Sequence, residues 1–427
     1  MSILNAMYTG VSGLDAESQA LGVIGNNVAN SNTTGFKESR AVFENVMGSA
    51  IGEPNAIGAG VVMQSTQQVF TQGSMVNTGQ PTDLAISGDG FFVVNGSSGG
   101  VTGNFYTRDG ETSLNNNGTL VNPDGLALQG YATMPNGQLS SQLGPITLQT
   151  AALAPKTTTN MTVTANLNAN ATPPATAWDP QNPATTSNFS TTMSVFDSLG
   201  NSHQVNVYFE NTGPNQWNYH MVANGSDVQG NTAGQNDEFG TGTLTFDSTG
   251  ALQSVTSTGG SVTFNGATAQ NINMNFGTPT SAGGTGLSGT TQFGTPSVVS
   301  SQSQDGYSSG SLSSVQIGQD GTVSGVYSNG QTVAEGQLAI AKFPSNNGLV
   351  QAGQNLWAAS QSSGEPALGA AGAGGRGALV SGSLEQSNVD IAAQFVDLIA
   401  HQRAFQASSK TITTADQMLQ DLMQITQ

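Results

Sequence analysis

The chain has 427 residues, enough for two to four domains of average size. Only 8% of the residues are charged, the net charge is −18, and 56 residues are glycine. No Lys or Arg occurs between Lys156 and Lys342, and the few basic residues form no cluster of the kind that binds phosphate groups. We therefore expect neither nucleic acid nor an anionic membrane surface as a partner.

The sequence contains no cysteine, which excludes disulfides, thiol catalysis and cysteine-ligated metals. No basic residue precedes Lys37, and glycine and polar residues interrupt the apolar positions before it, so we expect no cleaved secretory signal. No apolar run approaches the ~20 residues that cross a bilayer, so we expect no membrane insertion.

Residues 2–30 have the periodicity of a helix. Its apolar residues recur at steps of three and four, the pattern of a helix that packs along another helix: Leu4, Met7, Val11, Leu14, Leu21 and Val28. Glycines in this stretch each cost about 1 kcal/mol relative to alanine, so the helix should form only when a partner packs against it. Val23 and Ile24 lie off this stripe and should be exposed.

Residues 388–425 predict a second long helix, with Ser387 or Asn388 as its N-cap. Its apolar stripe consists of Ile391, Phe395, Leu398, Phe405, Ile412, Leu419 and Met423. One interpretation is a two-helix coiled coil that only closes the chain. The other is that the stripes also join separate molecules, since Val396 and Ile399 would otherwise remain exposed.

The centre of the chain predicts β-structure. Seven Asn-Gly and five Asp-Gly dipeptides occur in it, and such dipeptides between alternating apolar residues are the strongest short-range signal for hairpins. We expect hairpins around Asp89-Gly90, Asp109-Gly110, Asp124-Gly125, Asp320-Gly321 and Asn329-Gly330.

Shifts in composition divide the chain into nested parts of an α+β fold. Long terminal helices would form a coiled-coil inner domain, and nested all-β outer domains would be inserted between them. The predicted parts are residues 1–30 with 388–427 for the coiled coil, 31–70 with 356–387 for extended connecting arms, 71–147 with 291–355 for a first β-domain, and 148–290 for an inserted outer β-domain.

No constellation of residues predicts catalysis, a metal site or a cofactor. His203 and His220 fall in neighbouring predicted strands without a clear carboxylate partner, so we expect them at the surface. His401 should be solvated or lie at an interface. We predict no G-x-S-x-G nucleophile elbow, and the spacing of an EF-hand calcium loop does not occur.

Three regions resemble the signatures of the bacterial flagellar rod and hook axial protein family. The N-terminal region contains SGLDA at 12–16, NNVAN at 26–30 and TGFK at 34–37. The C-terminal region contains GSLEQSNVD at 382–390 and QRAFQ at 402–406, and PTDLAISGDGFFV lies at 81–93. VFDSLGNSH at 195–203 resembles the outer domain of hook members of the family, and together with the chain length it favours hook over rod.

The resemblance implies a subunit that polymerises with itself into a curved tube, a universal joint that passes torque from rod to filament. It implies export through the flagellar type III apparatus, assembly beneath a hook cap, and contacts with the distal rod and the hook–filament junction proteins. The location would be the flagellum, outside the cell. A distal rod subunit and a secreted β-rich adhesin are the alternatives, and an enzyme ranks last.

Residues 26–40 would then form the joint at which the inner helix turns outward to the β-domains. Asparagine tolerates left-handed backbone and caps helix ends, so residues 30–35 predict the helix stop, and Asn26, Asn27 and Asn30 belong to the predicted joint. Gly35 would supply a turn and Phe36 an apolar anchor. We expect substitutions at Gly35 or Phe36 to impair assembly more than monomer folding.

Overall fold

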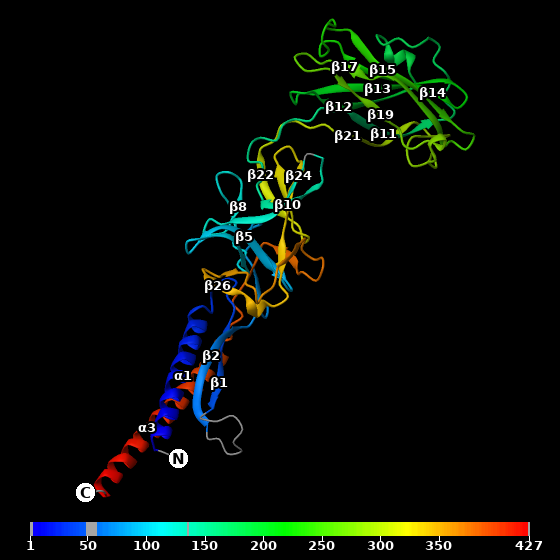
Figure 1. Ribbon diagram of the computed structural model, residues 1–427. Coiled ribbons are helices and arrows are strands. Elements are labelled where there is room, and N and C mark those ends of the chain that lie inside the picture. Colours follow the sequence, from blue (N-terminus) through cyan, green and yellow to red (C-terminus); the bar gives the residue numbers. More distant parts are fainter. Residues whose placement is uncertain (1–2, 48–57, 135, 426–427) are drawn as a thin grey trace. The chain divides into compact units, whose positions relative to one another are not determined.

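A computed structural model of the chain describes residues 3–47, 58–134 and 136–425 (Figure 1). It contains two compact units within this range. Unit 1 consists of Met1–Thr150, Ser314–Val326 and Thr332–Gln427, and unit 2 of Ala151–Ser313 and Tyr327–Gln331. The chain is mostly β-structure with one long helix near each end of the sequence, as predicted. The four-part division into nested domains stays a prediction.

The two terminal helices of unit 1 are α1 (Ile3–Ala29) and α3 (Ile391–Ile425). The predicted N-cap of α3 was wrong. Asp390 caps the helix, because its Oδ1 accepts the N–H groups of Ala392 at 2.8 Å and Ala393 at 3.2 Å. A carboxylate satisfies free N–H groups and also interacts favourably with the positive end of the helix dipole. Asn388 is instead engaged with the start of β1 and the end of β2, accepting from Glu38 N–H and donating to Val69 O.

Three small antiparallel sheets of unit 1 join segments near the helices. The longest is the hairpin of β1 (Ser39–Met47) and β2 (Gly58–Gln68), whose pairing the sequence had not revealed. The other two join early strands to late ones: β3 (Met75–Asn77) with β30 (Ser383–Glu385), and β4 (Leu84–Ser87) with β29 (Ala378–Ser381). The arm that returns to α3 is therefore held by strand pairing on both sides of Gly382.

The largest sheet in the described part of unit 1 has thirteen strands. They are β5 (Phe91–Ser98), β6 (Val101–Thr107), β7 (Ser113–Leu114), β8 (Leu120–Val121), β9 (Ala127–Thr133), β10 (Leu139–Pro145), β22 (Leu312–Ile317), β23 (Thr322–Tyr327), β24 (Thr332–Leu338), β25 (Ile340–Lys342), β26 (Val350–Gly353), β27 (Leu356–Ala358) and β28 (Ala367–Gly369). A short 3-10 helix, η2 (Asn346–Gly348), precedes β26. Two buried apolar clusters, one around Leu84 and Ile340 and one around Phe91 and Trp357, form its core.

Three predicted hairpins are confirmed and two were wrong. The turns at Asp124-Gly125, Asp320-Gly321 and Asn329-Gly330 join β8 to β9, β22 to β23 and β23 to β24. At Asp89-Gly90, however, β4 pairs with the returning β29 while β5 pairs with β6, β9 and β25. At Asp109-Gly110, β6 pairs with β5 and β27 whereas β7 pairs with β8. Neither of these two dipeptides therefore joins the strand before it to the strand after it.

Unit 2 contains a five-stranded sheet and a four-stranded sheet. The first runs in order through β12 (Phe189–Phe196), β13 (Ser202–Gly213), β14 (Gln216–Asn224), β15 (Asn236–Phe246) and β16 (Leu252–Gly259). The second consists of β11 (Asn160–Asn168), β19 (Asn273–Asn275), β20 (Thr291–Phe293) and β21 (Val298–Gln304). The remaining described elements of unit 2 are β17 (Ser261–Val262), β18 (Gln270–Asn271), α2 (Pro183–Thr186) and η1 (Thr280–Ala282). Alternate residues such as Val205, Val207 and Phe209 point into one apolar core, as the period of two in a strand requires.

Candidate assembly interface

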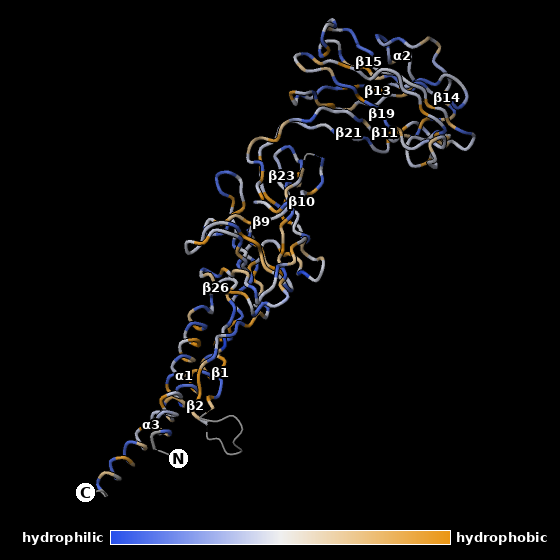
Figure 2. Tube along the Cα trace, viewed as in Figure 1, coloured by the Kyte–Doolittle hydropathy of each residue, from blue (hydrophilic) through white to orange (hydrophobic). Residues whose placement is uncertain are grey.

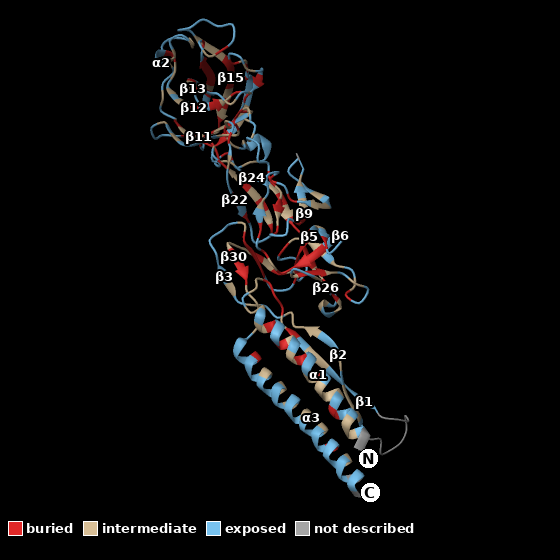
Figure 3. Ribbon diagram, turned by 90° about the vertical axis from the view of Figure 1, so that its left-hand side faces the viewer, coloured by how far each residue is buried: buried red, intermediate tan, exposed pale blue. Residues whose placement is uncertain are grey.

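The helices α1 and α3 pack side by side and antiparallel (Figures 1 and 3). A Cβ added to Gly10 would lie 2.8 Å from Cγ1 of Ile412, and one added to Gly13 would lie 3.0 Å from Oγ of Ser408. Near the other end of α1, Asn27 Nδ2 donates to Gln394 Oε1 at 3.0 Å. Two glycines one turn apart therefore allow the close approach of the helices, a role that their Gly-x-x-Gly spacing could have suggested.

The face of α1 against α3 is not the predicted apolar stripe. It contains Gly10, Gly13, Glu17, Ala20, Ile24 and Asn27, again spaced by three and four. The expectation that Ile24 is exposed was therefore wrong, since only 7% of it is accessible. The predicted residues Val11, Leu14, Leu21 and Val28 each follow a contact residue by one position. One residue rotates about 100° around the axis, which turns this stripe away from α3.

The stripe of α1 is exposed or half-buried within one chain. Val11 is 53% exposed, and Met7, Leu14, Leu21 and Val28 are of intermediate exposure. The predicted Leu4 belongs to α1, but its side chain lies outside the described part of the structure. Hydrophobic residues alternate with hydrophilic ones along both helices in Figure 2.

The predicted stripe of α3 is divided between two faces. Leu398, Ile412 and Leu419 are half-buried. They share the helical periodicity of the α3 residues that face α1, which are Gln394, His401, Ser408 and Ala415. By contrast, Ile391, Phe395, Phe405 and Met423 are exposed, together with the neighbouring Val396 and Ile399. Phe395 and Ile399 follow Gln394 and Leu398 by one residue, the same offset that separates the α1 stripe from its contact face.

The two exposed stripes lie on the same side of the helix pair. A step of one residue rotates in a fixed sense along each right-handed helix, and the helices run in opposite directions, so equal offsets point the same way. We call this surface the uncovered helix face: Met7, Val11, Leu14, Leu21 and Val28 of α1 with Ile391, Phe395 and Ile399 of α3.

The hairpin β1–β2 covers a different side of α1 (Figure 3). Its contacts involve residues one position before the α3-facing ones: Ser12 Oγ accepts the N–H of Val61 at 3.3 Å, and a Cβ on Gly60 would meet Ser12 and Thr9. The ring of Phe43 lies 6.2 Å from that of His401, which also binds Glu17 Oε2 through Nδ1 at 2.5 Å. The uncovered helix face is thus turned away from the hairpin.

The predicted joint residues form one connected structure at the end of α1. Asn30 Nδ2 donates to Asn26 O at 3.0 Å and to Asn26 Oδ1 at 2.8 Å, which ends the helix. Asn27 is buried and bonds both backbone groups of Ser39, donating to its O at 2.7 Å and accepting from its N at 2.9 Å. Asn27 therefore ties α1 to β1 as well as to α3, and the sequence had not indicated either contact.

Gly35 and Phe36 complete the joint. Gly35 has a φ of 69°, and its N–H donates to Glu385 O at 2.8 Å. A Cβ at Gly35 would lie 2.5 Å from the backbone N of Asp109, so only glycine fits both the backbone conformation and the space. Phe36 is buried, with 6% of it accessible, and its role as an anchor stays a prediction.

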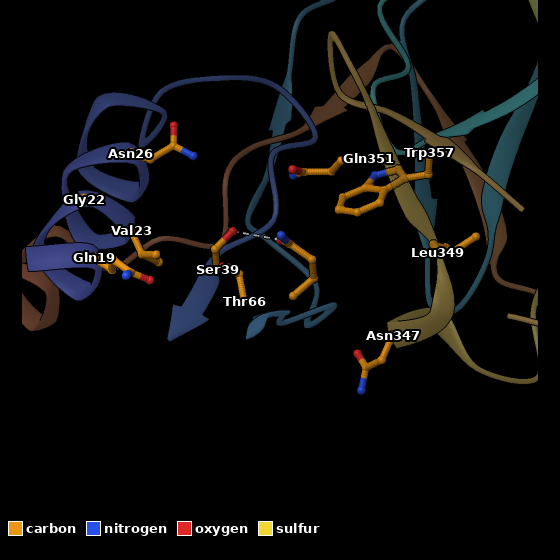
Figure 4. A pocket seen from close by; sticks show the side chains of 11 residues that line it. Gln19, Gly22, Val23, Asn26, Ser39, Thr66, Asn347, Leu349, Gln351 and Trp357 are labelled. Carbon is orange, nitrogen blue, oxygen red and sulfur yellow. Dashed lines mark hydrogen bonds between the residues drawn. The ribbon is translucent and has the colours of Figure 1, made fainter. Parts of the chain in front are cut away.

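A cleft of about 480 Å³ lies beside the joint (Figure 4). Gln19, Val23 and Asn26 of α1 line it together with Ser39 of β1 and Trp357 of β27. Its lining consists of amide, hydroxyl and apolar side chains without a titratable group. These groups can form hydrogen bonds and apolar contacts but offer no general acid or base.

The histidines of unit 2 correct a second expectation. His203 Nε2 lies 3.0 Å from Asp197 Oδ2, and its ring stacks on Phe264. His220 is buried, with Nδ1 2.7 Å from Glu238 Oε1, and it stacks on Trp178. Both therefore have carboxylate partners and brace the fold rather than face solvent.

Among the described residues, no cluster of three His, Asp or Glu is placed to hold a metal ion, and no helix is long and apolar enough to cross a membrane.

Comparison with protein families gives four matches along the chain. Residues 7–37 match the flagella basal body rod protein model and 85–166 the flagellar hook protein FlgE/F/G D1 domain. Residues 166–307 match the flagellar basal body protein FlaE D2 domain, and 380–425 the C-terminal model of the flagellar basal body rod FlgEFG proteins.

Whole-chain comparisons give similar results. The chain is 38% identical to the flagellar hook protein FlgE of Salmonella typhimurium, covering 97% of this chain and 98% of that protein. It is 38% identical to FlgE of Escherichia coli K12 and 35% identical to FlgE of Treponema pallidum, covering 98% and 99% of this chain and all of both relatives. The crystal structure of Helicobacter pylori FlgE2 shares the fold, with a TM-score of 0.53 at 16% identity over 71% of this chain and 98% of that one.

Proposed function

The chain belongs to the flagellar hook protein FlgE family, and we propose that it polymerises into the hook through its uncovered helix face, with a second copy of the same chain as the occupant. Membership of the family makes the chain a structural subunit of the flagellar hook. A hook subunit implies self-polymerisation. The proposal adds which surface of this chain makes that contact.

The exposure of large apolar side chains on the two helices is the observation that supports the proposal. Phe395 is 51% exposed and Ile399 is 49% exposed, on the same side of the helix pair as Val11. Complete burial of such a side chain contributes about 1.5–3 kcal/mol relative to leaving it in water. A second copy that covered several of them would therefore supply much of the free energy of association.

The composition of α1 agrees with ordering on assembly. Gly22 and Gly25 lie on exposed positions with no atom near an added Cβ, so they serve no packing contact within the chain. Each weakens the helix by about 1 kcal/mol relative to alanine. A helix of low intrinsic stability that gains contacts in the polymer couples its folding to assembly, because binding stabilises the folded form.

The finer assignments of location, partners and domains belong to the same proposal. The terminal helices would form an inner coiled-coil tube from residues 1–30 and 388–427, with the β-domains outside it. The polymer would join the distal rod at one end and the hook–filament junction proteins at the other. Its subunits would leave the cell through the flagellar type III apparatus and assemble beneath a cap, and the tube would act as a universal joint.

A distal rod subunit is the second candidate, because residues 7–37 and 380–425 match models named for rod proteins. The two candidates differ in the shape of the polymer. A hook subunit should form a curved tube and a rod subunit a straight one.

Serine substitutions on the uncovered helix face test the proposal. Val11→Ser and Phe395→Ser should each raise the critical concentration for polymerisation about tenfold or more, equivalent to the loss of about 1.4 kcal/mol of contact energy. Sedimentation of polymer from monomer measures this concentration. Val101→Ser is the matched control, because Val101 is 63% exposed at the start of β6. Equal critical concentrations for the Phe395 variant, the control and the unaltered chain would refute the proposed contact surface.

A further inference from the structure

A buried group of three charges lies where the arm before α3 meets the joint after α1. Glu385 Oε1 lies 2.6 Å from Lys37 Nζ, and Glu385 Oε2 lies 3.1 Å from Arg108 Nη1. The side chains of Lys37 and Glu385 are fully buried, and that of Arg108 is 4% exposed. Lys37 is the first basic residue in the sequence, and no sequence pattern indicated its two partners.

The three side chains connect several separate segments of unit 1. Glu385 Oε1 also accepts the N–H of Gly73 at 2.9 Å. Lys37 Nζ donates to Thr71 O at 2.8 Å, and Arg108 Nη2 donates to Gly88 O at 2.8 Å. The carboxylate thus holds together the chain after α1, the chain after β2 and the end of β6.

Glu385 is the anion that balances the two buried cations. An unpaired buried charge is strongly destabilising, and two cations without their carboxylate would also repel each other. Burial lowers the pKa of Lys37, and the charge of Glu385 opposes that shift. The Nε of Arg108 finds no hydrogen-bond partner among the described residues. Without Glu385, the closed joint would contain uncompensated positive charge.

The carboxylate comes much later in the sequence than the two cations that depend on it. Glu385 follows Lys37 by 348 residues and Arg108 by 277. It lies in β30, which pairs with β3, and Asn388 beyond it bonds Val69 O and Glu38 N. The joint after α1 is therefore completed by the segment that leads into α3.

We propose that Glu385 acts as a latch: residues 33–39 of the joint adopt their packed arrangement only when the C-terminal arm has docked and Glu385 pairs with Lys37 and Arg108. A chain whose C-terminal arm is missing or undocked leaves the joint open and α1 unpositioned, so only complete chains present a correctly placed helix pair. The latch is a property of the single chain and stands apart from the hook assignment.

Hydrogen exchange measured by mass spectrometry on the full-length monomer tests the latch. In Glu385→Gln, amides of residues 33–39 should exchange at least about 100-fold faster than in the unaltered chain, because two buried cations lose their partner. The β13 and β14 amides of unit 2 should exchange at unchanged rates. Glu365→Gln is the matched control, because Glu365 is an exposed carboxylate of unit 1. Slow exchange of residues 33–39 in Glu385→Gln, equal to that in the control, would overturn the proposal.

A second variant keeps the test decisive if Glu385→Gln unfolds unit 1. Adding Lys37→Met and Arg108→Met to Glu385→Gln removes both cations, and apolar groups of similar length can replace a buried ion network without large loss. Residues 33–39 of this triple variant should exchange at least about tenfold more slowly than those of Glu385→Gln. Exchange as fast as in the single variant would show that charge balance does not close the joint.

Discussion

Replacing Gly35 by alanine should destabilise unit 1 more than the same substitution at another glycine with left-handed backbone. Gly35 has a φ of 69° and Gly125 a φ of 81°. At Gly35 the added Cβ would lie 2.5 Å from Asp109 N and 2.7 Å from the carbonyl carbon of Arg108, whereas nothing lies within 4 Å at Gly125. Both contacting atoms at Gly35 belong to backbone and cannot rotate away. The two substitutions thus share the conformational strain and differ in the steric overlap.

The magnitudes follow from these two contributions. A non-glycine residue in the left-handed region costs about 1–2 kcal/mol, partly offset by the lower entropy of its unfolded chain. Overpacking against rigid neighbours adds about 1–3 kcal/mol. We therefore expect Gly125→Ala to lower the free energy of unfolding by about 1 kcal/mol and Gly35→Ala by about 2–4 kcal/mol.

Denaturant unfolding, followed by the fluorescence of Trp357 in variants lacking the two tryptophans of unit 2, measures the stability of unit 1. The midpoint should decrease clearly more for Gly35→Ala than for Gly125→Ala at an unchanged denaturant slope. Equal decreases would refute the steric argument. The structure also changes the earlier expectation for Gly35, since a contact with the backbone of Arg108 and Asp109 predicts a loss of monomer stability as well as of assembly.

Two further predictions concern α1 and the joint. Gly22→Ala should stabilise α1 by about 0.5–1 kcal/mol, because its Cβ meets no atom, whereas Gly10→Ala should gain nothing or lose stability, because its Cβ would meet Ile412. Thermal unfolding compares the two variants, and equal shifts of the unfolding temperature would contradict the contact at Gly10. Burial raises the pKa of Asp109 from 3.8 to about 6, so the native state holds this proton more tightly and loses stability as pH rises between these values. Asp109→Asn should therefore stabilise unit 1 by about 1–2 kcal/mol at pH 7.5 and leave its stability nearly unchanged at pH 3.5, as measured by denaturant unfolding. A gain of equal size at both pH values would show that the raised pKa of Asp109 is not its cause.

The sequence predicted the helices well and their contact faces less well. Residues at steps of three and four established α1 and α3, because helical periodicity is a local property. It could not distinguish the face that packs within the chain from the face that remains uncovered. Glycines at positions 10 and 13 make the closest approach to α3, and a search for apolar stripes passes over such residues.

Pairing between residues distant in the sequence explains most of the other differences between the predicted and the observed structure. Asp-Gly at 124–125 joins neighbouring strands, but β4, the strand before Asp-Gly at 89–90, pairs with β29, which lies almost 300 residues later in the sequence. His220 finds Glu238 across β14 and β15, and Lys37 finds Glu385 from the opposite end of the chain. Such partners depend on the complete topology, and no local spacing encodes them.

Electron microscopy of the purified chain under polymerising conditions shows whether the uncovered helix face joins subunits in a curved tube. We expect curved tubes from the unaltered chain and no tubes at the same concentration from a chain carrying both Val11→Ser and Phe395→Ser. Curved tubes of equal number from both chains would contradict the assignment of the uncovered helix face as the contact between subunits. Straight tubes from the unaltered chain would contradict the hook and favour the rod.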